Sequence, residues 1–220
     1  MKIEPISDAE YAVSGVRIKN IRDQTFCVFD LEATGPNEAE DSIIQIGGIL
    51  LNGRSKTIEK TFETLVKPSK SIPEVIERLT GIYNKEVEGA TGLSEIYPEF
   101  VEFSKGSILV TQAGYEFDWP LLHNECKRNG LTMLPNTIMD TKALFTYLFP
   151  EVNEIISTNF LIKFFNIDDS DIIRHTALGD SVLIGRIFIE LLKELEKRKI
   201  EEIHMDKPLI IKRVKLQKLL

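Results

Sequence analysis

The feature that most constrains this chain is the stretch of residues 26–35, in which an apolar run leads into two carboxylates and a Thr-Gly turn. Side chains on a β-strand alternate between its two faces, so Asp30 and Glu32 share one face. Residues 26–31 carry apolar side chains on both faces, apart from Asp30. A strand that is apolar on both sides is typical of the interior of a sheet. The stretch therefore predicts a central strand that ends in a pair of acids.

Asp30 and Glu32 would lie close together at the end of this buried strand. Two ionised carboxylates in such a place repel one another and lose hydration, so a positive charge should compensate them. A divalent cation does this through hard oxygen ligands, and Mg²⁺ suits a site with few carboxylates, waters and substrate phosphates. The alternative is that the two acids mark the point where the strand emerges into a solvated turn, since Gly35 and Pro36 are ordinary turn residues.

Length and composition favour one large α/β domain. The chain has 220 residues, and its apolar content of 43% can fill a sizeable core. Its formal charge of −7 excludes a protein that holds nucleic acid by overall positive charge, although a local site can still do so. Cys27 and Cys126 fall in an apolar strand and a helical segment, which predicts reduced, buried thiols.

The sequence also predicts a location. No apolar run is long enough to cross a membrane, and residues 1–20 lack the basic start and apolar middle of a secretory signal. We therefore expect a cytoplasmic protein without a membrane partner.

The pattern along the chain predicts a mixed sheet. Residues 42–51 read as a second strand that ends at the Asn52-Gly53 turn, a strong hairpin signal, and residues 56–66 return antiparallel. Residues 107–112 form a continuous apolar segment typical of a parallel strand covered by helices. Residues 137–140 are a short fifth strand. Helices are expected near residues 73–80, 93–104, 141–149 and 157–165, from Pro120 through Cys126, and from the segment 174–180 to about Lys199.

Two further places combine acids with apolar elements. Asp118 precedes Pro120 at a predicted helix N-terminus, where the helix dipole favours an anion; a plain capping carboxylate is the alternative. Asp180 lies on the same helical stripe as the apolar residues Leu183 and Ile184, and a carboxylate on a buried stripe is unusual unless it is paired or binds metal. His175 lies just upstream and could reach the same place, or could serve as a loop or capping residue.

Read in order, these places resemble the three motifs of the DEDDh exonucleases of the DnaQ-like family. The first motif of that family, F-D-x-E-x-T-G, is similar to residues 29–35. The second is a Phe-Asp pair after a strand, and the third is a His and an Asp five residues apart with Ala between them. The matching residues are Phe117-Asp118, His175, Ala177 and Asp180, with lesser agreement at residues 79–82 (Leu-Thr-Gly-Ile) and Asp140-Thr141. The resemblance covers residues 25 to about 195.

The resemblance implies an α/β, ribonuclease H-like fold with a mixed five-stranded sheet flanked by helices. It also implies a metal-dependent 3′–5′ exonuclease that removes nucleoside 5′-monophosphates from the 3′ end of DNA or RNA. Two Mg²⁺ or Mn²⁺ ions, about 3.5–4 Å apart, would be held by Asp30, Glu32, Asp118 and Asp180. His175 would take the proton from the attacking water. The metals reverse the local field, so that an acidic chain can bind a polyanion.

The same resemblance implies substrate contacts at Ala33, Thr34, Leu79 and Phe117. Ala33 and Thr34 would contact the terminal sugar, Leu79 would press on the last base, and Phe117 could stack nearby with little base preference. Core packing is the alternative for Leu79 and Phe117. The expected partner is the 3′ end of a single-stranded nucleic acid, with DNA favoured over RNA.

The chain departs from the family pattern in one motif and extends beyond it at both ends. Many members carry His-Asn before the second-motif Asp, whereas this chain has Gln112-Ala113. The choice of substrate therefore does not follow directly from the resemblance. We expect an N-terminal arm at residues 1–24, an exonuclease domain at 25–198 and a tail at 199–220. The arm or tail could bind a polymerase or a second copy, the tail could contact nucleic acid, or the tail could pack on its own domain. The basic residues of this tail are Lys212, Arg213, Lys215 and Lys218.

Two other functions remain open. One is a noncatalytic nucleic-acid-binding or polymerase-associated assembly module that keeps the fold, although such a module has no need of four converging carboxylates. The other is a metal phosphohydrolase of small nucleotides, which would prefer mononucleotides to a polymer end.

Overall fold

A computed structural model describes residues 1–214, and its centre is a mixed five-stranded sheet in the order β6-β5-β4-β7-β8. β4 pairs antiparallel with β5 and parallel with β7, while β6 is antiparallel to β5 and β8 is parallel to β7. The strands are β4 (Thr25–Ala33), β5 (Ile43–Asn52), β6 (Ile58–Leu65), β7 (Ile108–Thr111) and β8 (Ile138–Asp140). The predicted ribonuclease H-like sheet is therefore confirmed.

β4 is the central strand because it is apolar on both faces. The four residues from Phe26 to Phe29 are completely buried. β7 pairs with β4 only as far as the Val28–Val110 register, whereas β5 stays paired beyond it, with Asp30 opposite Gly47. The acidic end of β4 therefore extends past its parallel neighbour, which leaves room for a site on that side.

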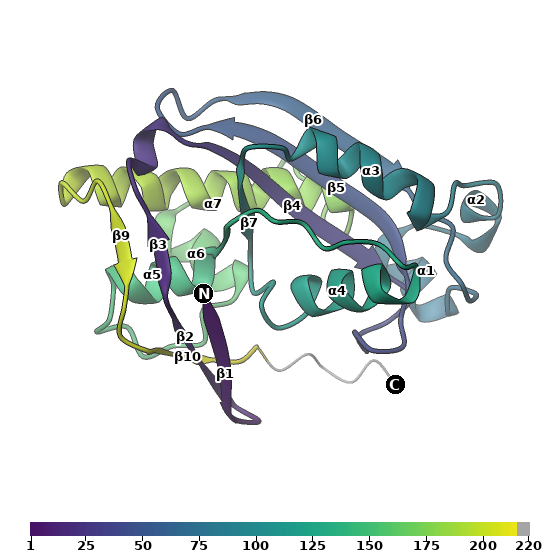
Figure 1. Ribbon diagram of the computed structural model, residues 1–220, viewed down its shortest axis with the longest axis horizontal. Coiled ribbons are helices and arrows are strands. Elements are labelled where there is room, and N and C mark those ends of the chain that lie inside the picture. Colours follow the sequence, from purple (N-terminus) through teal and green to yellow (C-terminus); the bar gives the residue numbers. More distant parts are fainter. Residues whose placement is uncertain (215–220) are drawn as a thin grey trace.

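Helices cover both faces of the sheet (Figure 1). α7 packs against the face of β4 that carries Phe26, where the Phe26 and Phe188 rings meet edge to face at 4.7 Å. On the opposite face, α3 places Phe100 against Phe29 at 5.6 Å. The helices are α1 (Glu74–Thr80), α2 (Asn84–Val87), α3 (Leu93–Phe103), α4 (Asp118–Arg128), α5 (Thr141–Leu148), α6 (Thr158–Phe165) and α7 (Ala177–Lys197).

Gly47 on β5 lets the start of α7 approach the sheet. A Cβ atom at this position would lie 2.1 Å from the carbonyl carbon of Ala177. The Ala177 amide also donates to Oε1 of Gln45 at 2.8 Å. Because Gly47 is directly opposite Asp30, this contact brings the first turn of α7 beside the acidic end of β4.

The two ends of the chain pair with one another. β1 (Lys2–Ser7), β2 (Glu10–Ser14) and β10 (Leu209–Lys212) form a three-stranded sheet, and β3 (Val16–Ile18) pairs with β9 (Ile203–Met205). A short 3-10 helix, η1 (Ile21–Asp23), leads into β4. The sequence analysis assigned no strand to the arm at residues 1–24 or to the tail at residues 199–220. Lys215 and Lys218 of the expected basic tail lie outside the described residues.

Some sequence expectations differ in detail from the structure. In α1, which the sequence predicted near residues 73–80, Ile76 is buried, whereas Val75 and Leu79 are 39% and 40% exposed. Cys27 and Cys126 are both buried and unpaired, as predicted. Within residues 1–214, no helix has the length and apolarity that crossing a bilayer requires.

Candidate active site

A cavity of about 390 Å³ opens where β4 extends beyond β7. Its walls come from the end of β4, the turn between β7 and α4, the start of α6 and the turn into α7. All five residues predicted to be catalytic line it: Asp30, Glu32, Asp118, His175 and Asp180. The fold thus brings together acids that are up to 150 residues apart in the sequence.

Asp30, Glu32 and Asp180 form the tightest part of this cluster. One carboxylate oxygen from each lies within 4.8 Å of the others. Asp30 and Glu32 come from one face of β4. Asp180 comes from the first turn of α7, which can pack closely on the sheet because Gly47 has no side chain. Asp118 is the first residue of α4 and is 6% exposed. These four carboxylates supply the hard oxygen donors that divalent cations prefer.

The pKa values of three of these acids are raised, because the carboxylates are buried and repel one another. Burial, followed by repulsion from Asp118, Glu32 and Asp180, raises the pKa of Asp30 well above its usual range. Burial and repulsion from Asp180 and Asp118 raise the pKa of Glu32 to about 8. Burial and the nearby Asp140 raise the pKa of Asp118 to about 7. The cluster therefore requires a compensating positive charge to ionise fully at neutral pH, and a bound divalent cation fits this requirement.

Asp180 has two partners within the protein. Arg174 donates through Nε to Oδ1 at 2.7 Å, and the backbone amide of His175 donates to Oδ2 at 2.8 Å. His175 has a φ of 60°, in the left-handed region, and its side chain is exposed on the cavity wall. The carboxylate of Asp180 therefore fixes the turn from which the imidazole projects.

The Gln112-Ala113 pair, which departs from the family pattern, also lines the cavity. Gln112 donates through Nε2 to the carbonyl of Ile156 at 3.2 Å, and its Oε1 accepts from the hydroxyl of Thr141. Both ends of this amide are thus used to join β7 to α5 and to the segment before α6. In this arrangement, the Gln112 side chain holds the elements of the cavity wall together.

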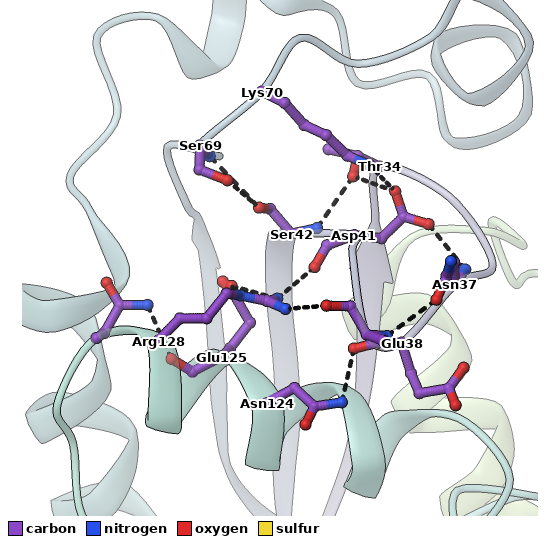
Figure 2. Close-up of polar contacts among 12 residues, drawn as sticks. Thr34, Asn37, Glu38, Asp41, Ser42, Ser69, Lys70, Asn124, Glu125 and Arg128 are labelled. Atoms are coloured by element: carbon purple, nitrogen blue, oxygen red, sulfur yellow. Dashed lines mark hydrogen bonds and ion pairs between the residues drawn. The ribbon is translucent and has the colours of Figure 1, made fainter.

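The predicted substrate-binding residues are distributed differently. Phe117 lines the cavity beside Asp118, whereas Ala33, Thr34 and Leu79 do not line it. Thr34 is buried, and its hydroxyl donates to Oδ1 of Asp41 and accepts from the amide of Ser42 (Figure 2). The Thr34 side chain therefore shapes the loop between β4 and β5, and Leu79 lies exposed on α1.

Figure 2 shows how that loop is held against α4. Arg128 donates to the carbonyl groups of Ala39 and Asp41, and Asn124 donates to the carbonyl of Glu38 at 3.0 Å. Glu125, which is buried, accepts from Arg128. The loop that follows Asp30 and Glu32 is thereby tied to the helix that carries Asp118.

Residues outside the predicted set also contribute to the cavity. Arg174, Asn159 and Glu116 line it. Glu116 accepts from Nζ of the fully buried Lys142 at 2.6 Å and from the amide of Val214 at 2.9 Å. Glu116 and Arg174 are close in sequence to Asp118 and His175, which is a usable signal, but nothing in the sequence singles out Asn159.

Comparisons with known proteins agree with this arrangement. A family model described as Exonuclease (RNase_T) matches residues 27–188. The DNA polymerase III subunit epsilon of Aquifex aeolicus is 33% identical over 176 residues, which cover 80% of this chain and 84% of that protein. The DNA polymerase III PolC-type of Caldanaerobacter subterraneus is 35% identical over 172 residues, covering 78% of this chain but 12% of that protein.

Solved structures share the fold. The nuclease domain of 3′hExo, described as a DEDDh family member bound to rAMP, has a TM-score of 0.71 at 22% identity, covering 80% of this chain and 95% of that one. Exonuclease I of E. coli in complex with a dT13 oligonucleotide has a TM-score of 0.65 at 17% identity, covering 80% of this chain and 42% of that one.

The fold and the family match place the chain among the nucleases of the ribonuclease H-like superfamily, and the acidic cavity is consistent with binding of divalent cations. Within that class, this chain belongs to the exonuclease family and is a DnaQ-like 3′–5′ exonuclease. The predicted family is therefore confirmed.

Proposed function

We propose that this exonuclease removes nucleoside 5′-monophosphates from the 3′ end of single-stranded DNA. The observation that carries the proposal is the cavity that gathers Asp30, Glu32, Asp118, Asp180 and His175, in a chain that matches most of a DNA polymerase III epsilon subunit. A cavity open at the end of a strand suits a chain terminus, which must enter with its last phosphodiester beside the acids.

The four carboxylates would hold two divalent cations, whose charge would offset the burial and mutual repulsion that raise the pKa of Asp30. When bound, such ions supply Lewis acidity and a template for in-line displacement at phosphorus. Mg²⁺ is the proposed physiological ion, since the donors are all carboxylate oxygens, and Mn²⁺ should substitute.

His175 is the proposed general base. Its side chain is exposed on the cavity wall, where it can reach a water beside the scissile phosphodiester. An imidazole ordinarily titrates near neutral pH, so it can accept a proton from that water and release it to solvent. Asp180 orients the His175 backbone through the hydrogen bond at 2.8 Å.

Phe117 is the proposed contact for the terminal nucleotide within the cavity, and Leu79 and the backbone of Ala33 and Thr34 would contact it from outside. A flat aromatic ring accepts any base, so base preference should be weak. Gln112 contributes through the shape of the wall, since its amide is engaged by Ile156 and Thr141.

DNA is the proposed polymer because relatives at 29–35% identity are named as DNA polymerase III chains. This chain spans only 12% of the length of the PolC-type relatives. We therefore propose a polymerase as the partner. It would be either a separate polypeptide or a part of the same polypeptide outside the matched region.

A digestion panel tests the proposal. Single- and double-stranded DNA and RNA oligonucleotides, labelled at the 5′ end, are incubated with Mg²⁺, with Mn²⁺ or with a chelator. We expect a ladder that shortens from the 3′ end of single-stranded DNA, and we expect it to disappear with the chelator. Faster shortening of RNA would reassign the polymer. Internal cuts, or hydrolysis of mononucleotides alone, would overturn the proposed function.

A further inference from the structure

A second cavity, of about 580 Å³, lies at the loop between β6 and α1. Its lining contains three lysines, Lys67, Lys70 and Lys85, and one acid, Glu88. Within residues 1–214, the active-site cavity is lined by five carboxylates and a single guanidinium. In a chain with a formal charge of −7, these lysines form a local excess of positive charge that is confined to the cavity lining, since Glu77 and Glu86 accept hydrogen bonds from Asn84 and Tyr83 at its edge.

The lysines of this cavity are accessible. Lys67, Lys70 and Lys85 are all exposed, and the hydroxyl-bearing residues Ser69 and Ser71 lie between them. Lys70 contacts Oδ1 of Asp41 at 2.5 Å, with its side chain 43% exposed (Figure 2). Lys67 and Lys85 have no ion pair within residues 1–214, so their ammonium groups are available to a ligand.

Exposed apolar surface adjoins the lysines. Val75, Leu79 and Tyr83 are 39–44% exposed, and all three fall within α1 or the turn that follows it. The Lys85 ammonium lies 5.6 Å from the centre of the Tyr83 ring. Ammonium groups beside a flat aromatic surface match the alternation of phosphates and bases along a single strand.

The Lys70 contact sets an upper limit on the distance between this part of the cavity and the active site. The Thr34 hydroxyl is 2.8 Å from Oδ1 of Asp41, and the same oxygen is 2.5 Å from Nζ of Lys70. Thr34 is two residues after Glu32, which places the Lys70 ammonium within roughly 15 Å of the Glu32 backbone. A few nucleotides of an extended strand span that distance.

We propose that Lys67, Lys85 and Tyr83 form a binding surface for the single-stranded body of the substrate, a few nucleotides before its 3′ end. The inference rests on the proposed function, which it extends from the terminal nucleotide to the strand behind it. The lysines contact phosphates, and Tyr83 stacks on a base. Lys70 stays with Asp41 and holds the loop that carries the surface.

Charge reversal at Lys67 and Lys85 tests the surface on substrates of two lengths. For Lys67→Glu with Lys85→Glu, we expect kcat/KM on a 20-nucleotide single strand to fall roughly tenfold through KM. Its salt dependence should become shallower by about 1.4, which is 0.7 for each phosphate that no longer meets a lysine. Hydrolysis of a dinucleotide, which is too short to reach the surface, should stay unchanged. The matched control, Lys105→Glu with Lys193→Glu, alters the charge equally in the turn after α3 and on α7, and it should leave both substrates unaffected.

Tyr83 tests the stacking component without any change of charge. Tyr83→Ala should raise KM on the 20-mer at least fivefold, and Tyr83→Phe, which keeps the ring, should retain the wild-type value. Equal losses on the 20-mer and the dinucleotide, or no loss on either, would overturn the surface.

A binding measurement can show whether the proposed surface is wrong independently of whether the proposed function is wrong. Fluorescence anisotropy of a labelled 20-mer, measured with Ca²⁺ and the full chain, reports the surface even if the wild type cleaves nothing. Loss of binding in the charge-reversal variant supports the surface. If that variant binds the 20-mer as well as the wild type does, or if a labelled polyglutamate probe binds the wild type equally well, the inference fails.

Discussion

Arg174 donates through Nε to Oδ1 of Asp180 across 2.7 Å, so an acid of the active-site cavity is paired with the one guanidinium that lines it. The same guanidinium lowers the pKa of Asp30, against the larger effects of burial and the other acids. Arg174 thus supplies part of the positive charge that the cluster requires. A cation that binds Asp180 must compete with this pair.

Arg174→Gln is therefore expected to tighten divalent-metal binding. The pair is partly exposed, with the side chains of Arg174 and Asp180 31% and 14% accessible, so its loss should be worth about 1 kcal/mol, or roughly fivefold in the Kd for Mn²⁺. Isothermal titration with Mn²⁺ measures the change. Arg186→Gln, which removes a guanidinium paired with Asp171 elsewhere, is the control. Weaker binding of Mn²⁺ by Arg174→Gln would show that Arg174 supports the site instead of competing for it.

The metal-free protein should lose stability as the pH rises. Glu32 has a pKa of about 8 in the folded state, against an ordinary value of 4.5, and Asp118 has about 7, against 3.8. The folded state therefore binds more protons than the unfolded state between these limits, and the free energy of unfolding falls with increasing pH. This contribution is fully present below about pH 4 and is lost as the pH passes through 7 to 8.

Thermal unfolding with a chelator at pH 5.5 and at pH 8.5 measures this effect. We expect a lower Tm at pH 8.5, restored by Mg²⁺. Glu32→Gln, which removes an acid of the cluster, should raise the metal-free Tm at pH 8.5 and weaken the response to Mg²⁺. A metal-free Tm that rises between the two pH values would contradict the raised pKa values.

The sequence predicted the parts of this molecule that depend on local order. Asp30 and Glu32 could be placed at the end of a central strand because the alternation of side chains within β4 determines their face and burial. Asp180 could be placed on the buried stripe of α7 because helical spacing relates it to Leu183 and Ile184. Each assignment needed only neighbours in the sequence.

Other features depend on partners that are remote in the sequence. The strands at the N-terminus were not predicted because β2 pairs with β10, almost 200 residues away, and no local pattern reports such a pairing. Likewise, the pair between Arg174 and Asp180 depends on the turn that His175 adopts at a φ of 60°.

Gly47→Ala should destabilise the fold and disrupt the acidic cluster together. The added methyl group would lie 2.1 Å from the carbonyl carbon of Ala177, so the start of α7 must move away from β5. We expect a loss of about 3 kcal/mol in the free energy of unfolding. Chemical denaturation measures it, and Gly89→Ala, whose Cβ would meet no atom within 4 Å, is the matched control. Equal stability of the two variants would show that α7 does not depend on this close approach.

His175→Gln should separate proton transfer from metal binding. The imidazole is exposed on the cavity wall, and the contact between this residue and Asp180 runs through its backbone amide, which glutamine retains. We expect turnover on a single-stranded oligonucleotide to fall 10²–10⁴-fold, as is typical when a general base is removed, with little change in the Kd for Mn²⁺.

Asp118→Asn, in contrast, should lose both turnover and metal affinity, because it alters a proposed ligand. His204→Gln, an exposed histidine paired with Glu202 in the terminal region, should leave both quantities unchanged. Turnover by His175→Gln within a factor of two of the wild type would remove the imidazole from the reaction and leave another acceptor for the proton of the attacking water.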